Sequence, residues 1–355
     1  MARLKRVDCS GPGITRRRRG KGFEYLDEEG RRITDPEVLD RIRELAIPPA
    51  WEDVWICPHP MGHLQATGVD AAGRKQYRYH DRWRERRDRE KFEEMLEFAR
   101  ALPRLRKRVQ KDLTLPGMPR ERALACAVRL LDRGFFRIGS EDYAEENETY
   151  GVATLHKRHV SVSGPKMTFE YEGKGGQTRI QAFVDPDAAE VVRALKRRRG
   201  GGEELLAYKD GHRWVDVKSA DINQYVKEIT GGDFSAKDFR TWTGTVLAAV
   251  GLAVAGPAAR GTKTGRKRAK TRAIKEVARY LGNTPAVARS AYIDPRVFDR
   301  YDGGRIISGI FEELAGDPSA WPDVQPLVEE AVLDLLEGDY ASEAIEKAEE
   351  LEKVA

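Results

Sequence analysis

The sequence predicts an α+β protein, with a small β-rich N-terminal domain and a larger, mainly α-helical domain that contains one small antiparallel sheet. The length of 355 residues is long for one domain and sufficient for two, each with its own core. Up to residue 79, short segments in which apolar and polar residues alternate dominate the sequence. Beyond residue 82 apolar residues recur mainly at helical spacing, and alternation returns only between residues 150 and 184.

We expect three parts, namely a β-rich domain over residues 1–85, a mainly helical domain over residues 86–311 and an acidic helical extension over residues 312–355. From residue 312 to the end the chain carries 14 acidic residues and two lysines, whereas the rest carries a net charge of +17. A body this cationic indicates a polyanionic partner such as nucleic acid. The alternative is a surface that charge keeps soluble, and net charge alone does not distinguish the two.

The N-terminal elements follow from local patterns. Residues 1–20 are basic and rich in glycine, which predicts a flexible arm. Residues 23–33 alternate around Asp27-Glu28-Glu29-Gly30 and predict a hairpin. A short helix is expected over residues 35–45, and strands over residues 54–57, 64–69 and 74–79.

The larger domain begins with a long charged helix, expected over residues 82–102, and continues with a helix over residues 119–133 and an acidic turn region over residues 140–149. Three strands of one sheet are expected over residues 159–163, 167–171 and 178–184. The further helices are expected over residues 186–197, 219–229, 235–254, 268–281, 324–336 and 341–353, with one short helix between Thr284 and Tyr292. We expect the two acidic helices at the end to pack on the larger domain and not to screen its basic surface.

Several protein classes are excluded by what the sequence lacks. No apolar run reaches membrane-spanning length, since residues 246–257 are too few. The basic N-terminus has no apolar segment of a secretory signal. Cys9, Cys57 and Cys126 are odd in number and scattered, which favours reduced thiols. These features predict a cytoplasmic protein with no membrane partner.

Metal and nucleotide cofactors are not expected either. Cys57-Pro58-His59 and His63 superficially suggest zinc, but no second Cys or His pair has matching spacing. The chain contains no Gly-rich phosphate-binding loop of the Walker type and no clustered carboxylates suited to Mg²⁺. We therefore expect no metal ligands and no cofactor.

Tyr292 is the candidate nucleophile. It follows the basic, small-residue run Ala288-Arg289-Ser290-Ala291, in a helix that Thr284 caps and Pro285 begins. A phenol becomes nucleophilic when cationic neighbours stabilise its charged form. The alternative is that Tyr292 packs its ring and hydrogen-bonds its hydroxyl, as most tyrosines do.

Four further positions carry groups that suit phosphate chemistry. Arg137 is a natural bidentate clamp for phosphate, or else pairs with the acidic run after it. Lys174 follows Gly173 in a glycine-rich turn, where it can reach a ligand and donate a proton, or is only solvated. Arg240 lies one turn after Lys237 in a helix that Ser235 begins. Asn283 can donate to a phosphate oxygen, or is an ordinary residue at a helix start.

Taken in order, these residues resemble the active-site set of the type IB DNA topoisomerases, and most closely the compact poxvirus-type and bacterial branch. The resemblance covers about residue 20 to about residue 300. The ordered set of residues is specific for this family, whereas each string alone is weak evidence for it. The supporting strings are Gly73-Arg74-Lys75-Gln76-Tyr77-Arg78-Tyr79, Phe136-Arg137-Ile138-Gly139, Glu146-Asn147-Glu148-Thr149-Tyr150-Gly151-Val152, Gly173-Lys174 and Leu281-Gly282-Asn283-Thr284-Pro285.

The resemblance implies an isomerase that relaxes supercoiled duplex DNA without metal or ATP. Tyr292 would attack a phosphodiester and become joined to the 3′-phosphate, freeing a 5′-hydroxyl that later attacks back. By the same resemblance Arg137 and Arg240 neutralise the transition state, and Lys174 protonates the leaving oxygen with assistance from Arg137. Poxvirus-type enzymes usually have histidine where this chain has Asn283, so we expect a different rate or pH dependence.

The resemblance also implies DNA contacts and a monomeric clamp that closes around duplex DNA in the nucleoid. Gln76, Tyr77 and Tyr79 resemble DNA contacts of the N-terminal domain, and Lys237 resembles a phosphate contact. The alternative for Tyr77 and Tyr79 is the core of the small domain, because strand alternation puts both on one face. The rival functions are a tyrosine recombinase or integrase, which usually has His-x-x-Arg where this chain has Lys237-x-x-Arg240, and a non-catalytic DNA-binding protein.

Overall fold

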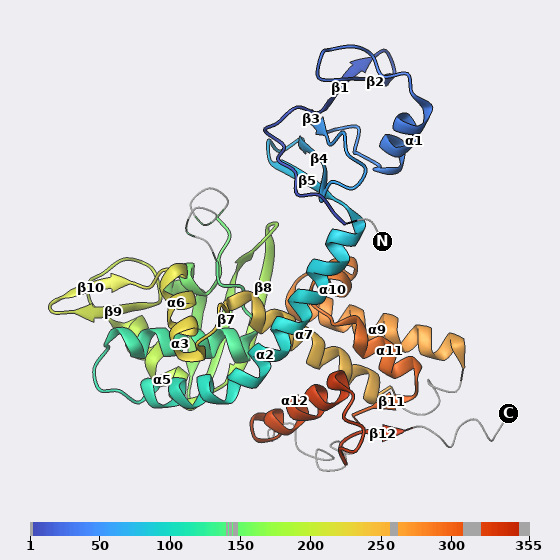
Figure 1. Ribbon diagram of the computed structural model, residues 1–355. Coiled ribbons are helices and arrows are strands. Elements are labelled where there is room, and N and C mark those ends of the chain that lie inside the picture. The colour runs from blue at the N-terminus through green and yellow to red at the C-terminus, as the bar shows by residue number, and fades with distance from the viewer. Residues whose placement is uncertain are drawn as a thin grey trace. The chain divides into compact units, whose positions relative to one another are not determined.

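The computed structural model describes residues 3–139, 141, 144, 148–255, 262–307 and 321–347, and its chain divides into two compact units, Met1–Glu93 and Glu94–Ala355 (Figure 1). The first unit is rich in strands and the second is mainly helical with small antiparallel sheets. The predicted α+β fold class is therefore confirmed. The predicted limits at residues 85 and 311 remain predictions. Within the described ranges no helix combines the length and the apolar character that a membrane span requires.

The first unit is built on one antiparallel sheet of order β2-β1-β3-β4-β5, with α1 (Pro36–Glu44) packed on it. Its core contains Ile14, Ile42, Val54, Ile56 and Ala66. Asp35 caps α1 by accepting from Glu37 N, and Pro36 takes the first helical position. The strands are β1 (Ile14–Arg19), β2 (Gly22–Leu26), β3 (Glu52–Ile56), β4 (Leu64–Val69) and β5 (Lys75–Tyr79).

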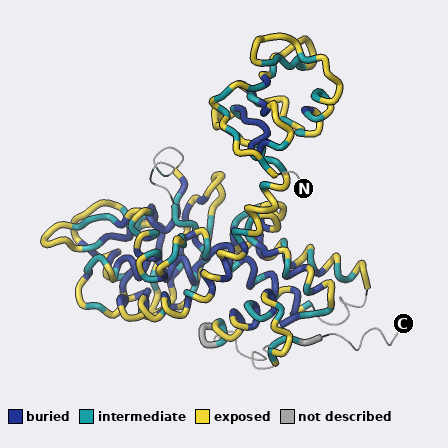
Figure 2. Tube along the Cα trace, viewed as in Figure 1, coloured by how far each residue is buried: buried dark blue, intermediate teal, exposed yellow. Residues whose placement is uncertain are grey.

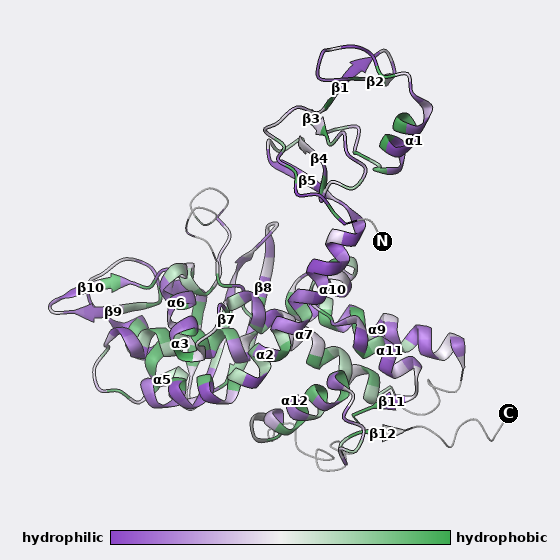
Figure 3. Cartoon of the chain, viewed as in Figure 1, coloured by the Kyte–Doolittle hydropathy of each residue, from purple (hydrophilic) through white to green (hydrophobic). Residues whose placement is uncertain are grey.

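One expectation for the first unit was wrong, and a second was incomplete. The described part of the predicted flexible arm is attached to the unit, because Lys5 N donates to Met61 O and His63 N donates to Lys5 O. The predicted hairpin forms around the expected turn, since Asp27 N donates to Arg31 O, Ile33 N donates to Tyr25 O and Leu26 bridges to Arg32, but β2 also pairs with β1 before it, which was not predicted. The run of arginines makes β1 almost entirely hydrophilic (Figure 3) and so concealed it as a strand. In the structure two of these arginines, Arg17 and Arg19, pair with Glu24 of β2.

The second unit places a three-stranded sheet, β6-β7-β8, beside α3 and α5, with the other helices grouped around α7 (Figure 1). Buried residues concentrate in α3, β7 and α7 (Figure 2). The long helix α2 (Asp81–Leu113) begins in the first unit and continues into the second. The other elements are α3 (Arg120–Gly134), η1 (Val152–Thr154), η2 (Lys157–His159), β6 (Val160–Ser163), β7 (Lys166–Gly173), β8 (Gln177–Val184), α5 (Pro186–Arg197), β9 (Ala207–Asp210), β10 (Arg213–Asp216), α6 (Ser219–Thr230), α7 (Ala236–Ala253), α9 (Lys263–Leu281), α10 (Pro285–Ala291), α11 (Pro295–Asp302), β11 (Arg305–Ile306), α12 (Trp321–Glu337) and β12 (Glu346–Lys347).

Most expected helices and all three strands of the main sheet are confirmed, but four details differ. The hairpin of β9 and β10 and the helix α11 were not predicted, since each is short and mixes polar with apolar residues. Helix α2 continues past Pro103, which the sequence suggested as its end. The predicted helix over residues 341–353 is wrong in its described part, where β12 pairs with β11. The expected acidic turn region lies mostly outside the described residues.

The first acidic helix of the tail packs on the second unit, as expected. Helix α12 contacts α7 and α11, and buries Val328, Val332 and Leu335. Arg106 of α2 donates to both carboxylate oxygens of Glu329, at 2.6 and 2.9 Å, and to both oxygens of Asp132 at 2.8 Å. This buried, charge-assisted network ties α12 to α2 and α3.

Replacing Glu329 by Gln is expected to lower the free energy of unfolding by about 2 kcal/mol, because a largely buried guanidinium loses one of its two charged acceptors. Urea denaturation would measure the loss. The matched control is Glu330→Gln on the exposed side of the same helix, where we expect a change within about 0.5 kcal/mol. Equal losses in the two variants would contradict the structural role of the Arg106 network.

Candidate active site

Tyr292 lies at the C-terminal end of α10, where the sequence placed it. Thr284 Oγ1 accepts from Val287 N, Pro285 begins the helix, and Tyr292 N donates to Ala288 O at 3.0 Å. The next residues, Ile293 and Asp294, are buried, whereas Tyr292 itself is only half-buried. Its side chain is therefore not sealed in an apolar core.

Helix α7 holds the backbone of Tyr292 through Gly244 and Thr245. A Cβ atom on Gly244 would lie 2.5 Å from Tyr292 O and 3.2 Å from Tyr292 Cβ, so only glycine permits this approach. Thr245 Oγ1 accepts from Asp294 N at 3.1 Å, just beyond the tyrosine. The position of Tyr292 is thus set by the contact of its own backbone with α7.

Three arginines from three elements meet at the C-terminal end of α9, where backbone carbonyls lack helical partners. Arg179 of β8 donates to Arg279 O at 3.3 Å and to Tyr280 O at 2.8 Å. The next two carbonyls have their own arginines: Arg240 donates to Leu281 O at 2.8 Å and Arg137 donates to Gly282 O at 3.0 Å. Four successive carbonyls therefore orient three guanidinium groups.

Glycine at position 282 permits this arrangement. Gly282 has φ +62° at the end of α9, and a Cβ atom there would lie 2.7 Å from Arg179 Nη1. The chain then turns, so that Asn283 Oδ1 accepts from Arg137 Nη2 at 2.5 Å. Asn283 is thereby fixed beside Arg137, nine residues before the tyrosine.

The electrostatics of Tyr292 favour its charged form. Burial raises its pKa, but the charges of Arg240 and Arg137 and hydrogen bonding from them outweigh burial, so the pKa of Tyr292 is lowered. Arg240 Cζ lies 5.0 Å from the centroid of the tyrosine ring. Burial and the charge of Arg137 lower the pKa of Arg240 to about 10, so this guanidinium is still positive at neutral pH.

Two buried donors in this site have no hydrogen-bond partner among the described residues: Arg240 Nε and Asn283 Nδ2. Unsatisfied buried donors are costly, and an anionic acceptor would satisfy them. A pocket beside them is lined by four basic side chains and by no carboxylate of the described chain. The basic residues in its lining are Arg137, Lys174, Arg179 and Arg240. The site is therefore suited to an anion such as a phosphodiester.

The structure brings Tyr292, Arg137, Arg240 and Asn283 together. Lys174 begins the turn between β7 and β8, is exposed, and lines the same pocket as Arg137 and Arg240. Lys237 lies one turn before Arg240, is also exposed, and is not among the residues that line the pocket. The capping box that we expected there forms, since Ser235 N donates to Asp238 Oδ2 at 2.7 Å.

The predicted DNA contacts of the first unit lie on the edge strand β5. The rings of Tyr77 and Tyr79 stack at a centroid distance of 6.1 Å, and Tyr77 is 48% exposed. The alternative that both tyrosines form the core of the unit is wrong, because the core lies elsewhere. Gln76 Nε2 donates to Asp70 Oδ2 at 2.9 Å. The DNA-binding role of these residues remains a prediction.

Sequence reasoning missed Arg179 and Tyr171, which pair across β7 and β8 and both line the pocket. Burial raises the pKa of Tyr171 to about 12, against the charges of Arg179, Arg240 and Arg137. The signal was present in the hairpin: once Gly173 pairs with Gln177, Arg179 falls opposite Tyr171.

Among the described residues, no three His, Cys, Asp or Glu side chains are grouped so that they could hold a metal ion. The region of Cys57 is included in this statement.

Known proteins resemble the chain in both units. A family model described as the catalytic core of eukaryotic DNA topoisomerase I matches residues 80–302, and one described as the N-terminal domain of bacterial DNA topoisomerase IB matches residues 22–70. DNA topoisomerase 1B of Acanthamoeba polyphaga mimivirus is 31% identical over 289 residues, which cover 79% of this chain and 85% of the relative.

Weaker similarities agree. DNA topoisomerase I of monkeypox virus is 21% identical over 269 residues, covering 74% of this chain and 81% of the relative. DNA topoisomerase 1 of Mycosarcoma maydis is 26% identical over 176 residues, covering 45% of this chain but only 17% of the relative.

The fold and the site together define an α+β protein with a tyrosine next to a cationic pocket that suits an anion. The matched models and relatives specify the family: the chain belongs to the type IB DNA topoisomerases and is an enzyme of that class. The resemblance inferred from Arg137, Lys174, Arg240, Asn283 and Tyr292 is therefore confirmed at the level of the family.

Proposed function

We propose that this enzyme relaxes supercoiled duplex DNA by cutting one strand through Tyr292 and resealing it. The observation that carries the proposal is the half-buried phenol of Tyr292 beside Arg240 and Arg137, which lower its pKa. At the same place, Arg240 Nε and Asn283 Nδ2 have no hydrogen-bond partner among the described residues. Both can therefore donate to a phosphate.

In the proposed reaction the Tyr292 oxygen attacks a phosphodiester phosphorus and forms a 3′-phosphotyrosyl bond. The bond from phosphorus to the 5′-oxygen breaks, and Lys174 gives that oxygen its proton, assisted by Arg137. Arg137 and Arg240 neutralise the charge that grows on the non-bridging oxygens, and Asn283 donates a hydrogen bond. After the DNA has rotated, the 5′-hydroxyl attacks the phosphotyrosine and restores both the strand and the phenol.

We further propose that no metal and no ATP take part. The phosphotyrosine keeps the energy of the broken phosphodiester, so resealing needs no external source. The guanidinium groups supply positive charge at the phosphate. In this proposal the enzyme acts as a monomeric clamp, in which Gln76, Tyr77, Tyr79 and Lys237 contact duplex DNA.

The direct test is to trap and map the covalent intermediate. A duplex oligonucleotide with a nick just downstream of the cleavage site loses its short 5′-hydroxyl strand after cleavage, which leaves the enzyme attached. We expect an adduct in EDTA without ATP, with the 3′-phosphate on the peptide that contains Tyr292. An adduct on another residue would overturn the assignment of Tyr292, and a requirement for metal would overturn the proposed metal independence.

Replacing Gly244 by Ala is expected to slow DNA cleavage about 100-fold while DNA binding persists. The added Cβ would lie 2.5 Å from Tyr292 O and push the nucleophile out of line. Single-turnover cleavage measures the effect. Gly251→Ala on the same helix is the control, because its Cβ would approach nothing closer than Ala273 Cβ at 3.4 Å. Similar rates for the two variants would mean that the contact with Gly244 does not position Tyr292.

A further inference from the structure

The first unit contains a second cationic pocket, separate in sequence from the Tyr292 site. Its volume of about 750 Å³ is within the roughly 300–1,000 Å³ typical of small-ligand sites. Among the described residues, five arginines line it, against a single carboxylate, that of Glu85. The arginines are Arg3, Arg6, Arg82, Arg86 and Arg89. Every residue of this lining belongs to the first unit, so the pocket does not depend on how the two units are arranged.

One wall is the start of α2. Arg82, Arg86 and Arg89 recur at helical spacing and therefore share a face of this helix. Trp83 N donates to His80 O in the first turn, which fixes the end of the helix where the backbone dipole is positive. Arg86 pairs with Glu90, whereas Arg89 forms no ion pair with a described residue. The charge of Arg89 on this wall is therefore not neutralised by an ion pair within the described part of the chain.

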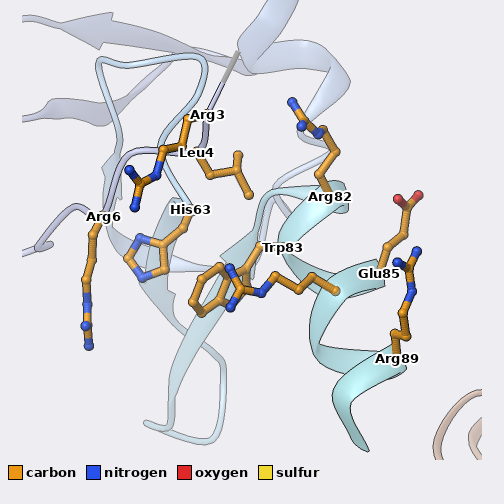
Figure 4. Close-up of a pocket in the computed structure, with 9 residues that line it drawn as sticks. Arg3, Leu4, Arg6, His63, Arg82, Trp83, Glu85 and Arg89 are labelled. Atoms are coloured by element: carbon orange, nitrogen blue, oxygen red, sulfur yellow. The ribbon is translucent and has the colours of Figure 1, made fainter. Parts of the chain in front are cut away.

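The opposite wall is the N-terminal segment, which is tied to the sheet. Lys5 N donates to Met61 O at 2.8 Å, and Val7 N donates to His63 Nδ1 at 3.2 Å. These bonds fix the chain on both sides of Arg6. Neither Arg3 nor Arg6 forms an ion pair with any residue in the described ranges. Figure 4 shows Arg3 and Arg6 on the side of this segment and Arg82 and Arg89 on the side of α2.

Aromatic rings lie between the two walls. Trp83 and His63 meet edge to face, with ring centroids 4.8 Å apart, and both line the pocket (Figure 4). Burial and the nearby charge of Arg6 lower the pKa of His63, so this imidazole is neutral at pH 7 and adds no charge. The partly exposed indole of Trp83 offers a flat apolar surface surrounded by guanidinium groups.

We propose that this pocket binds a nucleotide or a short single strand, with a base against the indole of Trp83 and its phosphates on the guanidinium groups of the two walls, Arg6 on one side and Arg82 and Arg89 on the other. Guanidinium groups pair with phosphate, and indole rings stack on bases whatever their sequence. An acidic peptide would use the arginines but not the indole surface. The nucleotide can come from an unpaired stretch of DNA or from a free nucleoside triphosphate, and the experiment separates these sources.

The test is photocrosslinking of the full chain with a single-stranded trinucleotide that contains 5-bromouracil. Irradiation should attach the probe to the peptide that contains Trp83. Arg82→Ala/Arg89→Ala should reduce this crosslink about tenfold or more, because two charged contacts are lost. The charge-matched control is Arg18→Ala/Arg19→Ala on the exposed side of β1, where the Trp83 crosslink should change less than about twofold.

A variant on the other wall and three competitors complete the test. Arg6→Ala should weaken the same crosslink, although it leaves α2 unchanged. An unlabelled trinucleotide that competes better than dTTP assigns the site to DNA, and the reverse order assigns it to a free nucleotide. Pyrophosphate competing as well as dTTP would overturn the proposal, because the base would then contribute nothing. If both double variants weakened the crosslink equally, non-specific charge attraction would explain the binding. This result would also overturn the proposal.

Discussion

Tyr292→Phe is expected to abolish both the covalent adduct and plasmid relaxation, while DNA binding stays within about twofold of the unmodified enzyme. The substitution removes only the attacking oxygen. The ring stays in place, because the backbone of Tyr292 lies against Gly244 of α7 and Arg240 Cζ lies 5.0 Å from the centroid of the ring. Adduct formation on a nicked duplex measures the first effect, and relaxation of a supercoiled plasmid measures the second.

The control for this prediction is Tyr280→Phe. Tyr280 is exposed, lies near the same arginine cluster at the end of α9, and contributes its backbone carbonyl to Arg179. Loss of its hydroxyl should leave relaxation unchanged. If Tyr292→Phe still relaxed DNA at the normal rate, a different residue would have to be the nucleophile, and the roles proposed for Arg137 and Arg240 would also fail.

The local surroundings of Tyr292 could be predicted from sequence because they depend on neighbours in the chain. Thr284 caps α10 and Pro285 begins it, and both signals are written within a few residues of the tyrosine. The same is true of the helix that carries Arg240, where Ser235 and Asp238 form the expected capping box. The hairpin that carries Lys174 followed from alternation interrupted by glycines. Each signal is local, so no tertiary information was needed.

The convergence of the arginines was not predictable in the same way. Arg137, Arg179 and Arg240 come from a loop, a strand and a helix, and they meet because the backbone carbonyls at the end of α9, where helical donors run out, accept from their guanidinium groups. No pattern near Arg179 indicates this long-range partner. The family resemblance supplied the positions of Arg137 and Arg240, but it contained no information on the carbonyls that orient them.

Tertiary pairing also overrode local propensity near the C-terminus. Residues 341–347 contain alanine, glutamate and lysine, which favour a helix, yet Glu346 and Lys347 pair with Ile306 and Arg305 as a short strand. In β1 the reverse problem occurred: the run of arginines suggested a mobile arm, although Arg17 and Arg19 pair with Glu24 of β2. Both errors arose from partners that lie elsewhere in the chain.

Arg240→Ala is expected to slow single-turnover cleavage about 10²–10³-fold, which is the usual effect of removing one preorganised donor to a charged transition state. Arg240 is 6% exposed, and its Nη2 is held by Leu281 O at 2.8 Å. Its position is therefore fixed before a phosphate arrives. Its loss removes both a donor to the phosphate and a positive charge beside Tyr292.

The pH profile distinguishes this effect from simple loss of fold. Arg240 is the first of the charges that lower the pKa of Tyr292, and burial alone would raise it. Without Arg240 the phenol should ionise at higher pH, so the rise of the cleavage rate with pH should move upward in Arg240→Ala. Arg240→Lys keeps a charge but not the planar fork, so it should recover the pH profile more fully than the rate. Arg289→Ala, which removes an exposed charge from α10, should alter neither quantity. An unchanged pH profile in Arg240→Ala would show that this guanidinium does not govern the ionisation of Tyr292, whatever the loss in rate.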